Sequence, residues 1–89
     1  MKLKTTNQFD KEVSKISDKK LVQKILDAIE LCQNAKAISD ISNLKKLKGF
    51  ETAYRIKIGD YRIGLVIEKS EITLSRFLHR KDIYRYFPK

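Results

Sequence analysis

The sequence of 89 residues contains 20 lysine and arginine residues against 11 aspartate and glutamate residues, which gives a formal net charge of +9. A chain of this length buries only about 60–65% of its unfolded surface, so it has enough core for one domain, 1–89, but not for two. Its 42% hydrophobic and 35% charged content is typical of a soluble globular protein. No stretch has the length of a membrane span or a signal peptide, so we expect a cytoplasmic protein without membrane contact.

The positive charge is concentrated in two segments. Residues 45–62 hold six basic and two acidic groups, and residues 76–89 hold five and one, so together they carry +8 of the +9. Such clusters favour a partner with dense negative charge. The alternative is a basic surface that only increases solubility.

Cysteine and histidine are scarce. Cys32 is the single cysteine, so an internal disulfide is excluded, and no Cys/His cluster suggests a structural zinc site. Cys32 falls at an apolar position of a helical pattern, which favours a small core residue over a nucleophile.

The N-terminal half predicts helices. Residues 2–6, KLKTT, are short and partly alternating, a pattern consistent with an edge strand. Apolar residues at helical spacing predict helices at 7–16 and 18–35, with Asp18 as N-cap of the second. Residues 36–49 mix helix breakers with two leucines, and we predict a connector that ends at Gly49.

The C-terminal half predicts strands. From residue 53 onward apolar residues alternate, which predicts strands at 53–58 and 61–68 joined by a two-residue turn at Gly59 and Asp60. A third strand is predicted at 71–79, followed by a short tail. The expected fold class is α+β, with two N-terminal helices packed on a small antiparallel β-sheet.

The two-residue turn sets the register of this hairpin. The expected pairs are Ile58–Tyr61, Lys57–Arg62, Ile56–Ile63, Arg55–Gly64 and Tyr54–Leu65. Paired residues share a face, so the apolar members form one face, which the helices can cover. Arg55, Lys57 and Arg62 share the other face, at spacings of about 5–7 Å that let them surround one phosphate. Gly64 leaves a shallow floor beside them. A solvated outer face is the alternative, but it commonly mixes Lys with Glu and Thr.

The third strand adds two candidate residues. Simple alternation places Phe77 and His79 on the cationic side, with Phe77 beside Arg62. An aromatic ring beside cations suits stacking on an unpaired base of single-stranded RNA. Arg76 breaks the alternation, which indicates a bulge or the end of the strand, so whether Phe77 or Arg76 faces the site stays open. A structural or merely exposed histidine is the more common alternative for His79.

The element order and three motifs resemble the RelE/ParE superfamily of bacterial toxins from toxin–antitoxin pairs. The motifs are L-K-G at 47–49, Y-R-I-K-I-G-D-Y-R at 54–62 and H-R-K-D-I-Y at 79–84, and the resemblance covers nearly the whole chain. It implies, for the RelE branch, cleavage of mRNA in the ribosomal A site. The ParE branch is similar in fold, lacks the cleavage residues and inhibits DNA gyrase.

The resemblance also implies roles for individual residues. The two basic residues of the RelE strand match Arg55 and Lys57, the following arginine matches Arg62, a later arginine matches Arg80, and a tyrosine matches Tyr84. The chain departs from the pattern in having arginine where the first basic residue is often lysine. The spacing from Arg80 to Tyr84 is also shorter than in the family.

RNA cleavage needs few groups, because the 2′-hydroxyl of RNA is itself the nucleophile. No carboxylate pair falls on the cationic face, which disfavours two-metal hydrolysis, and we expect no metal or cofactor. Lys57, between two like charges, is expected to give up its proton readily and act as the base. Arg55 and Arg62 would stabilise the phosphorane, and either Arg80 or His79 would protonate or neutralise the leaving 5′-oxygen.

We therefore predict a set of catalytic and substrate-binding residues. Tyr84 would stack on or orient the nucleotide at the cut. The predicted catalytic residues are Lys57, Arg62, Arg80 and Tyr84, and the predicted substrate-binding residues are Arg55, Phe77, His79 and Lys48.

The expected partners are the ribosome, mRNA and a cognate antitoxin. The antitoxin is expected to be acidic, partly disordered and able to fold on binding. Two other functions stay open: inhibition of gyrase by protein contact, and a non-toxic relative that serves as a partner or repressor component.

Overall fold

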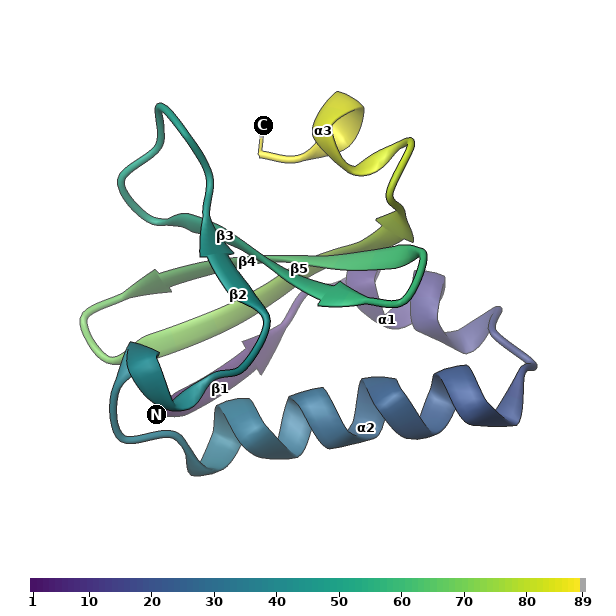
Figure 1. The fold of residues 1–89 in the computed structure, drawn as a ribbon, viewed down its shortest axis with the longest axis horizontal. Helices are drawn as coiled ribbons and strands as arrows, with labels where there is room; N and C mark the ends of the chain where they lie inside the picture. Colours follow the sequence, from purple (N-terminus) through teal and green to yellow (C-terminus); the bar gives the residue numbers. More distant parts are fainter. Residues whose placement is uncertain (89) are drawn as a thin grey trace.

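The computed structural model describes residues 1–88 and shows a five-stranded sheet with helices on both faces (Figure 1). The strand order is β1-β5-β4-β3-β2, with β1 parallel to β5 and the other pairs antiparallel. The elements are β1 (Lys2–Thr5), α1 (Asn7–Ser14), α2 (Lys19–Asn34), a 3-10 turn η1 (Ile38–Asp40), β2 (Leu44–Lys46), β3 (Ala53–Ile58), β4 (Tyr61–Glu68), β5 (Glu71–His79) and α3 (Ile83–Tyr86). None of the helices in this described part of the chain is long and apolar enough to cross a membrane.

Both N-terminal helices begin at side chains that cap their free N–H groups. The Thr6 hydroxyl accepts a hydrogen bond from Phe9 N at 3.1 Å at the start of α1. Asp18 accepts from the N–H groups of Lys20 and Leu21 at the start of α2, which confirms the predicted cap. α1 ends two residues and α2 one residue before the predicted boundary.

The β3–β4 hairpin has the register predicted from the turn. All five predicted pairs are present, from Ile58 with Tyr61 to Tyr54 with Leu65. Gly59 has φ +57°, the conformation that a glycine at this turn position supplies without steric cost. The hairpin is therefore fixed by local sequence.

The β4–β5 pair contains a bulge that shifts the alternation of β5. Gly64 pairs with Arg76 and the next residue, Leu65, pairs with Leu74, so Ser75 has no partner on β4. One unpaired residue moves every later side chain of β5 to the opposite face. The bulge indicated by Arg76 is thus present, at Ser75.

The connector predicted at 36–49 contains a strand that the sequence did not reveal. β2 has three residues, and Lys45 pairs with Arg55 on the neighbouring strand. Three residues are too few for an alternating pattern to be recognised. The sheet therefore extends one strand further beside the cationic side chains than expected.

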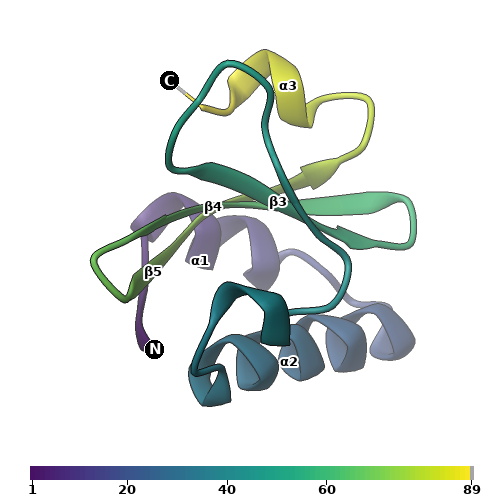
Figure 2. The same cartoon turned by 60° about the vertical axis from the view of Figure 1, so that its left-hand side comes forward.

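Apolar side chains form a core on each face of the sheet. The larger core lies between the sheet and helices α1 and α2, and includes the buried Cys32. The smaller one lies on the opposite, outer face, where α3 and the chain after it fold back over the sheet (Figures 1 and 2). It consists of Leu47, Ala53, Ile83 and Phe87, with Val66 and Leu78 packed against them. Part of the outer face is thus covered, whereas the sequence suggested an open surface.

Candidate nucleic-acid interface

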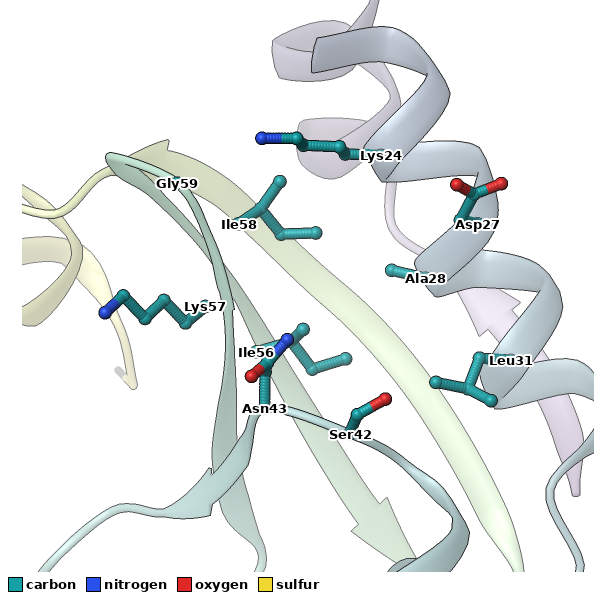
Figure 3. Close-up of a pocket in the computed structure, with 10 residues that line it drawn as sticks. All are labelled: Lys24, Asp27, Ala28, Leu31, Ser42, Asn43, Ile56, Lys57, Ile58 and Gly59. Atoms are coloured by element: carbon teal, nitrogen blue, oxygen red, sulfur yellow. The ribbon is translucent and has the colours of Figure 1, made fainter. Parts of the chain in front are cut away.

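Three predicted cations lie on the outer face of the hairpin. Figure 3 shows Lys57 pointing away from α2, whereas its neighbours Ile56 and Ile58 point toward the helix. Arg62 pairs directly with Lys57, and Arg55 lies two residues along β3, so both share the face of Lys57. Lys45 of β2 pairs with Arg55 and extends the row. We call Lys45, Arg55, Lys57 and Arg62 the cationic face.

Backbone carbonyl groups hold the two guanidinium groups of this face. Arg55 Nη1 donates to the carbonyl oxygen of Asn43 at 3.0 Å. Arg62 Nη1 donates to the carbonyl oxygens of Gly59 and Tyr61, both at 2.9 Å. A neutral carbonyl orients a guanidinium group but does not neutralise its charge. The positive charge of the cationic face is therefore retained.

Acidic side chains pair with other cations. Within residues 1–88, every carboxylate that lies within 4.0 Å of a basic nitrogen contacts Lys2, Lys4, Arg76 or Arg80. The cationic face has no such carboxylate. It can therefore accept an anion from solution without first breaking an ion pair.

Arg80 lies at the same turn as Arg62. The backbone N–H of Arg80 donates to the carbonyl oxygen of Asp60 at 2.8 Å, which ties the end of β5 to the hairpin turn. Arg80 Nε is 3.8 Å from Asp60 Oδ1, and both side chains are exposed. An exposed ion pair of this length contributes little to stability and opens readily. Arg80 is thus available to a ligand that reaches Arg62.

Tyr84 and Lys48 lie in a groove of the outer face that Lys45 also lines, whereas Arg55, Lys57 and Arg62 are not among its lining residues. The groove has a volume of about 540 Å³ and lies between the β2–β3 loop (47–52) and α3. Tyr84 is 61% exposed. We call this feature the aromatic groove, and its lining residues are Lys45, Lys46, Leu47, Lys48, Phe50, Tyr84, Phe87 and Pro88.

The prediction that Phe77 lies on the cationic side is wrong. Phe77 pairs with Ile63, is 3% exposed and stacks on Tyr61 with ring centroids 5.0 Å apart, all on the helix side of the sheet. The cause is the bulge at Ser75, which reverses the alternation beyond it. A side chain this buried is a core residue and cannot stack on a base.

The predicted position of His79 is wrong for the same reason. His79 pairs with Tyr61, so it lies on the helix side of the sheet, where its ring meets the Tyr61 ring edge-on at 5.4 Å. Its Nδ1 accepts a hydrogen bond from Lys81 N at 3.2 Å. His79 is therefore separated from the cationic face by the sheet.

Arg76, the other candidate for the position beside Arg62, is already engaged. Its Nη2 lies 2.7 Å from Glu12 Oε2, and its guanidinium carbon lies 5.6 Å from the centre of the Tyr86 ring. Glu12 also accepts from Phe77 N at 2.8 Å. These contacts link α1, β5 and α3, so Arg76 has a structural role.

Sequence reasoning missed three residues that line the aromatic groove, one of which also belongs to the cationic face. Lys45 belongs to the cationic face only because β2 pairs with β3, and this short strand gave no signal. Lys46 and Phe50 line the aromatic groove. The cluster of lysines at 45–48 was the sequence feature that could have indicated these residues, and it was interpreted only as a contribution to net charge.

A second cavity lies on the other side of the hairpin, between α2 and β3 (Figure 3). It has a volume of about 350 Å³. Its walls combine apolar side chains such as Leu31 and Ile56 with the charged Lys24 and Asp27. Lys57 is one of its lining residues, although its side chain points away from α2, so the cavity adjoins the strand that carries the cationic face.

Comparison with known proteins identifies the family. Residues 3–84 match the model of a family described as "ParE toxin of type II toxin-antitoxin system, parDE". The chain is 48% identical over 61 residues to Toxin RelE3 of Methanocaldococcus jannaschii, which covers 67% of this chain and 69% of that protein. The chain therefore belongs to the ParE toxin family of type II toxin–antitoxin systems, and the predicted resemblance to the RelE/ParE superfamily is confirmed.

Solved structures show the same fold. The toxin in the RelB–RelE antitoxin–toxin complex from Methanococcus jannaschii has a TM-score of 0.78 and 36% identity, with 96% of this chain and 99% of that chain covered. The archaeal RelE–RelB complex from Pyrococcus horikoshii OT3 gives a TM-score of 0.72 at 19% identity, over 92% and 97% of the two chains. The predicted α+β fold of this toxin is therefore confirmed, and its relatives are toxins of the RelBE type.

Proposed function

We propose that this toxin is an endoribonuclease that cleaves mRNA on the ribosome. The observation that supports the proposal best is the cationic face: four basic side chains from three adjacent strands share one surface, and no carboxylate among residues 1–88 lies within ion-pair distance of them. The phosphodiester of RNA is an anion that such a surface binds. Similarity to Toxin RelE3 and to the toxin of the RelB–RelE complex supports the same branch of the family.

The proposed reaction uses the 2′-hydroxyl of the substrate. Lys57 removes its proton, the 2′-oxygen forms a bond to phosphorus, and the bond from phosphorus to the 5′-oxygen breaks. The products are a 2′,3′-cyclic phosphate and a 5′-hydroxyl. Because Lys57 is exposed and Arg62 lies directly across the ladder, both can contact the same phosphate.

Three arginines would stabilise the charge that develops. Arg55 lies beside Lys57 along β3, and Arg62 lies across from it on β4. Backbone carbonyl groups hold both guanidinium groups, so their charges are in place before substrate binds. Preorganised charge of this kind is often the largest contribution to catalysis. Arg80 would neutralise the leaving 5′-oxygen, which takes its proton from water. The positive charge of the face also disfavours binding of a divalent cation there.

We also propose that the chain binds a cognate antitoxin. The solved relatives include antitoxin–toxin complexes from two archaea and a toxin–antitoxin complex from Escherichia coli. With a net charge of +9, this chain favours an acidic partner segment. Such a segment would fold on binding and cover part of the cationic face.

A second candidate function is inhibition of DNA gyrase by protein contact, because the matching family carries the ParE description. The cationic face supports cleavage instead, since a purely binding toxin does not need these basic residues arranged around one phosphate position. After expression of the toxin is induced, an endoribonuclease would cleave mRNA, whereas a gyrase inhibitor would cause breaks in DNA. A non-toxic relative would leave growth unchanged.

The chemistry of the cut ends tests the proposed reaction. The expected result is cleavage of a translated message, mapped by primer extension after brief induction, with cyclic-phosphate and 5′-hydroxyl ends. Cleavage should stop when initiation of translation is blocked. Intact messages together with DNA breaks would replace this proposal with gyrase inhibition.

A further inference from the structure

We propose that Asn43 is a positioning residue for the cationic face, because its left-handed backbone aims one carbonyl oxygen at both Arg55 and Lys57. The inference rests on the proposed RNA cleavage and adds to it a residue that acts through Arg55 rather than on the substrate. Asn43 lies beside β3, where the chain enters β2 (Figure 3). Its contribution is a guanidinium group that is already fixed in place when RNA binds.

The carbonyl oxygen of Asn43 accepts two hydrogen bonds. One comes from Lys57 N at 3.2 Å and the other from Arg55 Nη1 at 3.0 Å. A carbonyl oxygen has two lone pairs, so it can accept both. The first bond fixes the oxygen against the backbone of β3, and the second fixes the guanidinium group of Arg55 against that oxygen. Arg55 and Lys57 are thus connected through one atom of Asn43.

The backbone of Asn43 has a conformation that few residues adopt. Its φ is +63°, in the left-handed region, which asparagine visits more readily than most residues other than glycine. A change to the extended conformation of a strand would alter ψ by roughly 90° and give the carbonyl oxygen a new direction. The end of a β ladder accounts for the bond from Lys57 N, but it does not require a positive φ and does not account for the bond from Arg55.

The same arrangement occurs on the other side of Lys57. Gly59 has φ +57°, and its carbonyl oxygen accepts a hydrogen bond from Arg62 Nη1 at 2.9 Å. Within residues 1–88, Arg55 and Arg62 are the arginines whose side chains donate to backbone carbonyl groups. Each of them therefore depends on a left-handed residue at a turn. Charge that is held in this way needs no rearrangement when the phosphorane forms.

The alternative is that the side chain of Asn43, rather than its backbone, contributes to the site. That side chain is exposed, and the oxygen that Arg55 contacts belongs to the main chain. Two substitutions separate these explanations. Glycine removes the side chain but keeps the left-handed conformation accessible, whereas a β-branched residue disfavours that conformation. Asn43→Gly should therefore behave like wild type, and Asn43→Val should not.

The first measurement follows Arg55 directly, without RNA. In protein labelled with nitrogen-15 arginine, a guanidinium group that is held by a carbonyl rotates slowly about its Cζ–Nε bond and gives separate Nη signals at low temperature. Wild type and Asn43→Gly should show separate Nη signals for Arg55, and Asn43→Val should show one averaged signal. The signals of Arg76, which Glu12 holds, should be the same in all three proteins.

The second measurement is the rate of cleavage of a translated message. Asn43→Val should lower this rate by about 10-fold, less than the ~100-fold or more expected when a charge-stabilising group is removed, because Arg55 is loosened but still present. In an Arg55→Ala background the same substitution should have no further effect. A merely structural role would give the same loss in both backgrounds, since the effects of independent changes add.

The matched control is Ser70→Val. Ser70 is also exposed and has the same φ of +63°, but it lies in the β4–β5 turn, at the opposite end of β4 from Arg62. Ser70→Val should lower stability to a similar degree and leave the Arg55 signals and the cleavage rate unchanged. Asn43→Ala is the milder variant to measure if Asn43→Val does not fold.

Loss of the separate Arg55 signals in Asn43→Gly would overturn the proposal. Separate Arg55 signals or an undiminished cleavage rate in folded Asn43→Val would also overturn it, as would an equal loss of cleavage in Ser70→Val. Because the Arg55 signals are measured without RNA, they do not depend on the proposed reaction. Arg55 signals that respond to Asn43 as expected, in a protein that makes no cuts in translated mRNA, would reject the proposed function and keep Asn43 as the residue that orients Arg55.

Discussion

The ring of Phe87 lies against Gly64 at a distance that no side chain at position 64 would allow. A Cβ added to Gly64 would be 2.6 Å from Phe87 Cδ2 and 2.8 Å from Phe87 Cγ. This contact fixes the chain after α3 on the outer face of the sheet, between the cationic face and the aromatic groove. The glycine that seemed to leave a shallow floor in the sequence instead receives an aromatic ring.

Gly64→Ala should therefore destabilise the protein. The added methyl group must displace the Phe87 ring, and overpacking of this kind costs about 1–3 kcal/mol. Chemical denaturation should show this loss in the free energy of unfolding. In a Phe87→Ala background the same Gly64→Ala change should cost much less, because the ring is gone. An equal cost in both backgrounds would show that the contact is not the cause.

Glu12→Gln should destabilise the protein and alter its response to pH. Burial raises the pKa of Glu12, but hydrogen bonds from Arg76 and Phe77 N–H, together with the charge of Arg76, outweigh burial and hold the pKa below its ordinary value. The side chains of Glu12 and Arg76 are 11% and 22% exposed, so solvent screens this pair only partly. Loss of the charged hydrogen bonds should cost about 1.5–3 kcal/mol near neutral pH.

The sign of the pH dependence follows from that lowered pKa. A carboxylate with a depressed pKa in the folded state stabilises the protein above its unfolded pKa, and this stabilisation is lost as the pH falls through the folded pKa. Unfolding measured from neutral to acidic pH should show wild type and Glu12→Gln converging in acid. The control is Glu71→Gln, which breaks the exposed pair with Lys4 and should change stability far less at neutral pH. A constant difference at all pH values would contradict the assignment.

Ser70→Gly should stabilise the protein. Lys69 and Ser70 form the β4–β5 turn with φ +50° and +63°, a conformation that disfavours residues with a Cβ. Glycine at 70 should raise the free energy of unfolding by about 0.5–1 kcal/mol. Gly59→Ala, at φ +57° in the other turn, should lower it by a similar amount. Changes in the same direction at both turns would reject this explanation.

Cys32 should be inert in the folded protein. It is fully buried in the main core, and burial raises the pKa of its thiol to about 11. A thiol-reactive dye at pH 8 should label it only after denaturant is added, because the nucleophile is the thiolate. Rapid labelling of the native protein would show that the core opens readily at α2.

The hairpin could be predicted because its determinants are local. Gly59 sets the turn, the alternation of apolar residues sets the faces, and the register follows from these two facts. No other information was needed to predict that Arg55, Lys57 and Arg62 share a face. This part of the candidate site was therefore predictable from residues 54–65 alone.

The remaining parts depend on contacts between distant residues. The bulge was indicated by Arg76, but its position at Ser75, which decides the face of Phe77, depends on pairing across β4 and β5. The position of the tail over the sheet depends on the packing of Phe87 against Gly64. Neither contact produces a periodic pattern in the sequence. The face of Phe77 and the covering of the outer face therefore could not be predicted from sequence patterns.

The most direct test of the central claim is cleavage of a translated message by variants of the cationic face. Lys57→Ala and Arg62→Ala should each lower the rate by about 100-fold or more, as expected for loss of a base or a charge-stabilising group. The triple variant with Arg80→Ala should make no detectable cuts while keeping its circular dichroism spectrum. Lys19→Ala, an exposed lysine at the start of α2, is the matched control and should cut like wild type. Wild-type cleavage by the folded triple variant would contradict the account.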